Sequence, residues 1–291
     1  MSEKKYYLPE PSYWPLVGSI GLFTTVFGFA HALEFHRDNL GGHLTMLYIG
    51  LAILAFMMFG WFGTVIRESE GGKYNAQVDT TFRMAMMWFI FSEVMFFAAF
   101  FGALFYARQL SVPWLGGADP VTHQYLWDKF SANWPLLHNP DPSKFASPKG
   151  VIEPFGIPLL NTIILLSSSV TVTIAHHALK ANKRGALTFW LLITVILGFT
   201  FLGFQAHEYY EAYTELNLKL DSGIYGTTFF MLTGFHGLHV TIGATMLTIM
   251  LLRVLKGHFK PDHHFAFEAA SWYWHFVDVV WLGLFIFVYW L

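Results

Sequence analysis

The residue with the clearest chemical potential is Glu93, which lies in a long apolar stretch between Arg83 and Arg108. In a helix it would lie about 15 Å along the axis from Arg83, near the middle of a hydrocarbon layer roughly 30 Å thick. An ionisable group at that depth costs roughly 2.5–3.5 kcal/mol. We therefore expect Glu93 to be a buried carboxyl with a functional role. It is either kept neutral by its apolar surroundings or paired with a group on another helix.

Histidine and carboxylate side chains also occur in or at the ends of other apolar stretches. Because such groups in membrane segments usually bond to one another or line a site, we expect an intramembrane polar network. Its members are His207, Glu208, His236, His239, His275 and Asp278. The pair His176 and His177 ends another apolar stretch.

His236 and His239 could bind a metal, because residues three apart share one face of a helix. The alternative is hydrogen bonding to neighbouring helices, which polar side chains commonly provide in membranes. We favour hydrogen bonding, since no carboxylate or thiol pattern completes a metal site and the chain has no cysteine. The sequence therefore predicts no bound metal, and spacing alone does not indicate a haem pocket.

His275 and Asp278 are also three residues apart. A histidine and a carboxylate on one helical face can bond to each other, which would satisfy both at membrane depth. We expect them to form such a pair.

The elements that must position these groups are predicted to be helices in a membrane. The chain is 55% hydrophobic and only 12% charged, whereas soluble domains carry about 25% charged residues. Its net charge of -2 argues against nucleic-acid binding, and we expect no cleaved signal peptide. The stretches long enough to span a bilayer are 14–35, 43–66, 83–108, 157–179, 186–206, 224–252 and 268–290.

The distribution of basic residues predicts the orientation. If the N-terminus is on the inside, the basic clusters at 180–184 and 253–260 both lie inside, as the positive-inside rule requires. Seven spans then place the C-terminus outside. The segment 109–156 is rich in proline and reads as an external loop. We treat residues 1–291 as a single all-α membrane domain.

Several motifs, in order along nearly the whole chain, resemble those of cytochrome c oxidase subunit III. They are Ser92-Glu93-Val94-Met95-Phe96-Phe97, the run Ser167 to His177, Gln205 to Glu211, Thr233 to Val240, and His264 to Trp281. No one of them is decisive alone, but their combination and order are specific.

The resemblance implies a non-redox subunit of a haem–copper oxidase. Subunits I and II would be its partners and would hold the haems and coppers, with cytochrome c acting on the complex. The chain itself would bind no cofactor. It would hold phospholipids in a cleft between helices 1–2 and helices 3–7, stabilise the catalytic subunit and support proton uptake.

The resemblance also implies roles for single residues. Glu93 takes the position of the family's carbodiimide-reactive carboxyl, and Arg67 and Arg83 match positions close to lipid head groups. Trp61 joins this lipid-binding set, although Trp61-Phe62 stands where the family usually has two tryptophans. The run before Arg83 also departs from the family pattern, so we expect the loop between helices 2 and 3 to bind lipid or subunit I differently.

Two further expectations concern the branch and the location. Quinol-oxidising relatives have five spans, so seven favour the cytochrome c branch. We favour a bacterial cytoplasmic membrane over the mitochondrial inner membrane. The alternative function is a secondary transporter with an intramembrane carboxylate. Co-purification with haem-bearing partners would discriminate the two.

Overall fold

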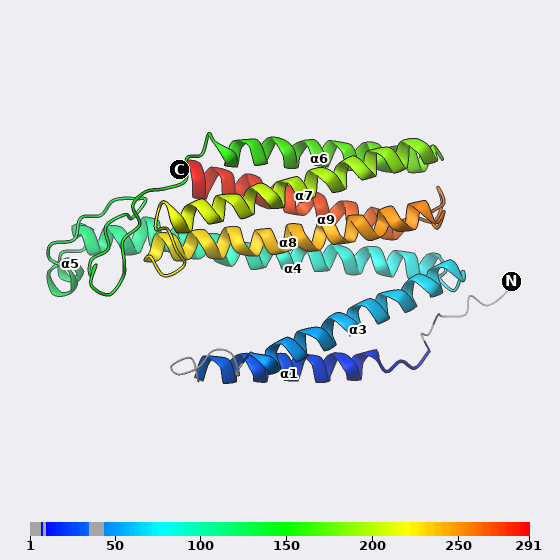
Figure 1. The fold of residues 1–291 in the computed structure, drawn as a ribbon, viewed down its shortest axis with the longest axis horizontal. Helices are drawn as coiled ribbons and strands as arrows, with labels where there is room; N and C mark the ends of the chain where they lie inside the picture. The colour runs from blue at the N-terminus through cyan, green and yellow to red at the C-terminus, as the bar shows by residue number, and fades with distance from the viewer. Residues whose placement is uncertain (1–6, 8–9, 35–43) are drawn as a thin grey trace. The chain divides into compact units, whose positions relative to one another are not determined.

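A computed structural model describes residues 7, 10–34 and 44–291 of the chain. The long elements of this structure are all helices (Figure 1). No strand occurs in these described ranges. The helices are α1 (Trp14–Glu34), α3 (Thr45–Glu70), α4 (Ala76–Tyr106), α5 (Pro120–Leu126), α6 (Ile157–Lys180), α7 (Arg184–Thr214), α8 (Ile224–Leu255) and α9 (Phe265–Leu284). The π-helical segments are η1 (Ala107–Ser111), η2 (Trp114–Ala118) and η3 (Phe285–Trp290).

Seven helical segments are long and apolar enough to cross a membrane, which confirms the all-α membrane fold predicted from the sequence. The third is longer than expected, because it continues through η1 and η2 and reaches Ala118. In a membrane, helices satisfy their own backbone hydrogen bonds, so long apolar segments of this kind are the stable solution.

The chain divides into two compact units, residues 1–82 and 83–291, and the division falls near the start of α4. In the first unit, α1 and α3 pack on each other where glycines allow a close approach. A Cβ atom added at Gly28 would lie 2.4 Å from the backbone nitrogen of Leu47, and one at Gly50 would lie 2.4 Å from that of Thr25. Small residues at such contacts are typical of membrane helix pairs.

In the second unit, α6, α7, α8 and α9 form a bundle in which α6 contacts α7 and α9, and α8 contacts α7 and α9. Side chains of α4 reach this bundle, as in the edge-to-face contact of Phe96 with Phe235. The last span is the most buried. In its most apolar 18-residue stretch 61% of the residues are buried, against 11% for α3. Trp274 and Trp281 of α9 are fully buried.

The segment 109–156 is only partly the loop that was expected. Residues up to Ala118 remain helical, and α5 follows at once. Proline was read as a helix breaker, but Pro113 directly precedes η2 and has helical backbone angles. Inside a helix a proline removes one backbone hydrogen bond and distorts the helix, and Pro113 lies between the π-helical segments η1 and η2, where the helical bonding is already irregular. The helix instead turns at Gly117, whose φ is 111°.

Asp119 begins α5 by accepting hydrogen bonds from the backbone nitrogens of Val121 and Thr122. The Thr122 hydroxyl also donates to this carboxylate, which holds the pKa of Asp119 below its usual range. The short helix therefore starts with a charged N-cap of the kind that favours helix initiation.

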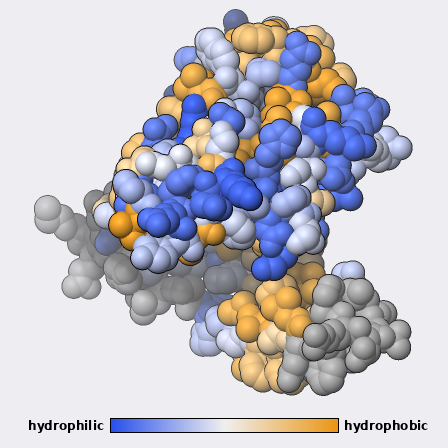
Figure 2. All heavy atoms as spheres, turned by 90° about the vertical axis from the view of Figure 1, so that its left-hand side faces the viewer, coloured by the Kyte–Doolittle hydropathy of each residue, from blue (hydrophilic) through white to orange (hydrophobic). Residues whose placement is uncertain are grey.

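Residues 127–156 lie over the connection between α7 and α8. The amide of Asn139 donates to the carbonyl of Ser222 at 3.0 Å, and the backbone nitrogen of Lys149 donates to the carbonyl of Leu216 at 2.7 Å. Figure 2 views the molecule from the end that carries this segment, where hydrophilic residues gather. The segment therefore forms a polar cap over that end of the bundle.

Candidate functional site

Glu93 of α4 is paired with His239 of α8, with 2.8 Å between its Oε2 and the histidine Nε2. The second ring nitrogen, Nδ1, lies 2.6 Å from the carbonyl of Phe235 and must donate to it, since a carbonyl only accepts. The Glu93–His239 contact therefore contains a proton of its own. Either a neutral acid donates to the imidazole, or an imidazolium donates to the carboxylate.

The surroundings of this pair are aromatic. The His239 ring lies edge to face with Phe97 and parallel to Tyr273, with centroid distances of 4.9 and 6.4 Å. The Glu93 side chain is 21% exposed and that of His239 only 9%. The expected burial of Glu93 is thus partial in this chain, because only one side of α4 packs on the bundle.

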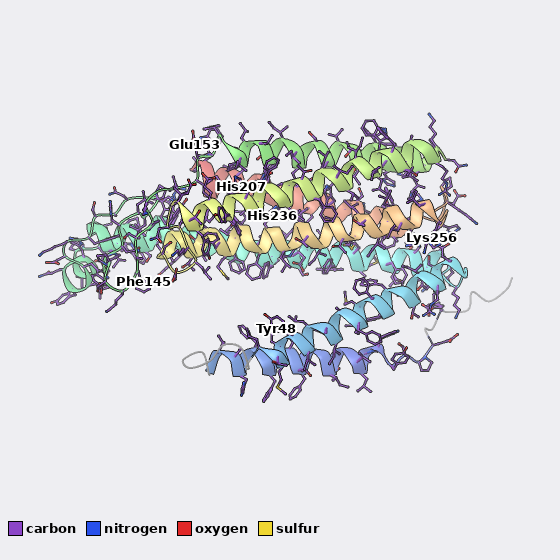
Figure 3. The ribbon with its side chains drawn as sticks, in the orientation of Figure 1. Tyr48, Phe145, Glu153, His207, His236 and Lys256 are labelled. Carbon is purple, nitrogen blue, oxygen red and sulfur yellow. The ribbon has the colours of Figure 1, made fainter. Side chains whose placement is uncertain are left out.

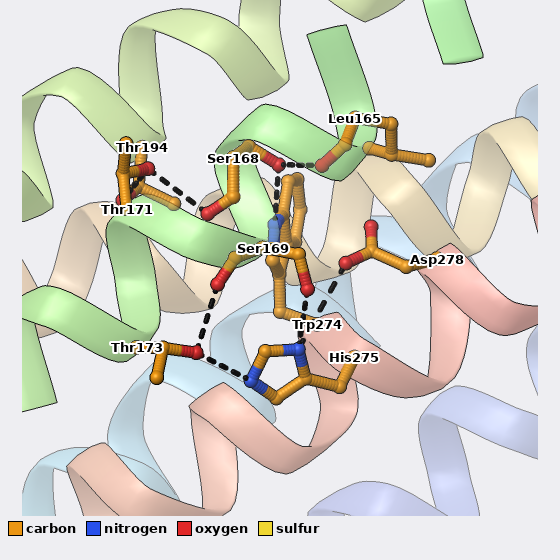
Figure 4. Close-up of polar contacts among 9 residues, drawn as sticks. All are labelled: Leu165, Ser168, Ser169, Thr171, Thr173, Thr194, Trp274, His275 and Asp278. Atoms are coloured by element: carbon orange, nitrogen blue, oxygen red, sulfur yellow. Dashed lines mark hydrogen bonds and ion pairs between the residues drawn. The ribbon is translucent and has the colours of Figure 1, made fainter. Parts of the chain in front are cut away.

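His275 is held by α6 rather than mainly by Asp278 (Figure 4). Its Nδ1 lies 2.6 Å from the Ser169 hydroxyl, and its Nε2 lies 3.3 Å from that of Thr173. The nearest Asp278 oxygen is 3.9 Å from Nδ1. The predicted histidine–carboxylate pair exists, but as a longer contact within a cluster that joins α6 to α9.

Glu208 belongs to a second buried cluster near the other end of the bundle. Its Oε1 accepts a hydrogen bond from the Tyr289 hydroxyl at 2.5 Å and lies 3.5 Å from the amide nitrogen of Gln205. Tyr289 comes from η3, so the contact links α7 to the end of the last span. The sequence singled out Glu208 but gave no reason to expect Tyr289 as its partner.

His236 does not make the hydrogen bonds predicted for it. It is fully buried, and neither ring nitrogen has a hydrogen-bond partner within the described part of the chain. Its ring packs between Phe201 and Trp281, with centroid distances of 5.9 and 5.2 Å. Aromatic packing takes the place of polar pairing at this position, whereas His239 bonds to Glu93 of another helix.

His207 is exposed and does not join the network that was expected (Figure 3). It directly precedes Glu208, and neighbouring residues on a helix point about 100° apart. With Glu208 turned into the bundle, His207 faces away from it. The spacing of hydrophobic residues around position 207 was too uniform to show which face is outside.

The residues expected to bind lipid have different surroundings. Arg67 is exposed, and its guanidinium bonds to the Gly63 carbonyl and the Thr64 hydroxyl of its own helix at 3.3 and 3.2 Å. Trp61 is 47% exposed. Arg83 forms an ion pair with Glu268 of α9, with 2.7 Å between Nη1 and Oε2. Its charge therefore has an intramolecular partner that the sequence did not indicate.

The sequence did not predict several hydrogen bonds between helices, because serine, threonine and tryptophan are each common in membrane segments. The indole nitrogen of Trp274 donates to Ser168, and that of Trp281 donates to Thr162, at 2.8 and 2.9 Å. The small polar residues of α6 were a usable signal, since such residues mark helix–helix contacts. Their partners on α9 could not be found without the three-dimensional arrangement.

Comparison with known proteins decides the family. The model of "Cytochrome c oxidase subunit III" matches residues 4–139 and 141–291. Proteins named "Cytochrome c oxidase subunit 3" are 42% identical in Squalus acanthias, 41% in Carassius auratus and 43% in Pongo abelii. Each alignment covers 98% of this chain and 96% of the relative. The chain belongs to the cytochrome c oxidase subunit III family.

Membership in the subunit III family confirms the resemblance found in the motifs. It makes the chain an integral membrane subunit of an oxidoreductase complex, in which subunit III is not itself the catalytic subunit. It also removes the support for a secondary transporter, which rested only on an intramembrane carboxylate. The Glu93–His239 pair is then a feature of a subunit that works in a complex with other oxidase subunits.

Proposed function

We propose that this subunit stabilises the catalytic subunit of a cytochrome c oxidase, holds structural phospholipids and supports proton uptake during oxygen reduction. Its partners are subunits I and II, which carry the haems and coppers, and cytochrome c is the electron donor. The chain itself carries no redox centre. We place the complex in a bacterial cytoplasmic membrane, with the N-terminus inside. The vertebrate relatives keep a mitochondrial location open as the alternative outcome.

The observation that carries the proton-related part is the Glu93–His239 pair. One proton is shared between two groups of different helices, with aromatic rings around it and part of the carboxyl exposed. Such a pair can respond to protonation without any charge-changing cofactor in this chain. Its role is therefore indirect, through packing or lipid contact beside the catalytic subunit.

Arg67 supports the lipid-related part. It is exposed at the end of a membrane span, and within the described part of the chain its guanidinium bonds to groups of its own helix, so its donors can also meet a phosphate. Arg83 contributes less in this proposal, because Glu268 already neutralises it. Binding of structural phospholipid, as the family resemblance implies, remains part of the proposal.

Glu93→Gln in the assembled, reconstituted oxidase tests the proton-related role. Glutamine keeps the shape and hydrogen bonding, so assembly and most electron transfer should persist. Glu93→Lys should impair insertion or packing, since it places an ammonium beside His239. Oxygen consumption and proton release are measured together, with the exposed Glu215→Gln as the matched control. Loss of oxygen reduction in a normally assembled Glu93→Gln complex would make Glu93 a direct proton-transfer residue and contradict the proposal.

Arg67→Ala tests the lipid-related role. Phospholipid retained after detergent washing should fall, whereas Arg67→Lys, which keeps the charge, should retain more. Quantitative lipid analysis of the purified complex measures both. Equal lipid content in wild type and Arg67→Ala would remove Arg67 from the proposed lipid site.

A further inference from the structure

Three side chains with metal-binding atoms meet at the end of the second unit that carries the basic clusters. His176 lies in the last turns of α6, His264 immediately precedes α9, and Glu268 lies in its first turn. One ligand atom from each lies within 4.8 Å of the others. In the described residues, this is the group of three whose atoms could surround one ion.

The histidines of this cluster have nitrogens available. Nδ1 of His264 lies 3.2 Å from the Lys260 carbonyl and must donate to it, which leaves Nε2 with its lone pair. Nε2 of His176 is shielded from solvent and has no hydrogen-bond partner in the part of the chain that the structure describes. The two rings lie edge to face, with their centroids 5.3 Å apart. A backbone carbonyl that fixes the tautomer of a histidine is a common support for a metal ligand.

The carboxylate of the cluster is partly engaged. Oε2 of Glu268 pairs with Arg83, which leaves Oε1 to bind another group. The Glu268 side chain is only 16% exposed, and His176 and His264 are half-buried. The three side chains are therefore held in place by the fold, and each keeps some exposed surface at that end of the bundle.

We propose that His176, His264 and Glu268 form an exchangeable binding site for a divalent transition-metal cation of the Zn²⁺ type. Two imidazoles and one carboxylate are the protein ligands of many open zinc sites, which keep a further position for a small ligand. Mg²⁺ and Ca²⁺ fit poorly, because they take mainly oxygen ligands. The proposal revises the expectation of no metal drawn from the sequence, which considered only His236 and His239.

The surrounding charges make this a reversible site rather than a resident cofactor centre. Arg83 competes for Glu268, and Lys180 lies one helical turn after His176. Exposed His177 and His263 are sequence neighbours of the two ligands but lie outside the cluster. A bound cation would tie the end of α6 to the start of α9 without taking part in electron transfer. The site is independent of the function proposed above.

Zinc titration of the full chain tests this inference. The chain is purified in detergent without a polyhistidine tag, and Zn²⁺ is titrated against a chromophoric chelator. We expect one Zn²⁺ per chain, with nitrogen ligands at about 2.0–2.1 Å and one oxygen at roughly 2.0–2.2 Å by X-ray absorption. His176→Ala and His264→Ala should each weaken binding by about tenfold or more, whereas His177→Ala and His263→Ala should not.

Arg83→Gln separates a true ligand effect from a folding defect. Removing the competing guanidinium should free Glu268 and tighten zinc binding, which a misfolded chain would not do. The inference is overturned if the wild-type chain binds no zinc or if Arg83→Gln weakens binding. It also fails if the two control histidines matter as much as His176 and His264. None of these results would bear on the roles proposed for Glu93 or Arg67.

Discussion

The helices within each of the two units pack together by different means. In residues 1–82, α1 and α3 meet at Gly28 and Gly50, where each glycine faces the backbone of the other helix. In residues 83–291, buried polar side chains join the helices, as in the bond from Trp274 to Ser168. Trp274 also fills the space beside Gly198 and Gly243, so there the small residues accommodate a ring rather than a backbone.

This difference reflects the number of neighbours that a membrane helix has. Lipid is as apolar as leucine, so two helices alone gain mainly from close contact, which only small residues permit. A bundle has an interior away from lipid, where polar groups can be satisfied by one another. The most apolar stretches of α1 and α3 are each 11% buried, whereas those of the four spans from α6 to η3 are 33–61% buried; the span that begins with α4 is also only 11% buried. The polar chemistry of the chain is therefore concentrated in the second unit.

The largest expected effect comes from filling the close contact in the first unit. Gly50→Leu would place a Cβ 2.4 Å from the backbone nitrogen of Thr25, which cannot move aside cheaply. We expect the opening free energy of α1 and α3 to fall by about 3 kcal/mol. Hydrogen–deuterium exchange, read helix by helix, measures it. Gly63→Leu on the same helix is the control, because nothing lies within 4 Å of its Cβ. An equal loss in both variants would contradict close packing as the cause.

A smaller effect is expected from removing one buried hydroxyl in the second unit. Ser168→Ala leaves the indole nitrogen of Trp274 without its acceptor. The opening free energy of α6 and α9 should fall by about 1.5 kcal/mol. The same exchange measurement applies, with Ser92→Ala as control, since the Ser92 hydroxyl is exposed and bonds only to its own helix at Phe89. If Ser92→Ala costs as much, interhelical hydrogen bonding is not what holds this unit.

The smallest expected effects are the coupling energies of two polar contacts, one from each unit. A double-mutant cycle on Ser169 and His275, which are 2.6 Å apart, should give about 0.6 kcal/mol. A cycle on Trp14 and Thr64 of the first unit, whose contact is 3.3 Å, should give less. Unfolding in mixed micelles supplies both values. A larger coupling for Trp14 and Thr64 would show that polar contacts matter as much in the first unit.

Much of this fold could be predicted because length and hydropathy decide membrane spans. A stretch such as 224–252 has no stable alternative to a helix in lipid, and α8 indeed covers Ile224–Leu255. The helical continuation beyond Tyr106, through η1 and η2, could not be predicted, because the prolines that begin at Pro113 favour a loop there. The motifs around Glu93 and His236 predicted the family, which the comparisons confirm.

For the polar residues of the site, the sequence and the tertiary structure determined different properties. The sequence by itself determined which ionisable groups lie at membrane depth, since that depends only on position in an apolar run. Only the tertiary structure decided their partners, because a partner on another helix depends on how each helix is rotated about its axis. It paired Glu93 with His239, turned His207 outward, enclosed His236 in aromatic rings and joined Arg83 to Glu268. That rotation is set by the packing of whole helix faces, which no local stretch of sequence encodes.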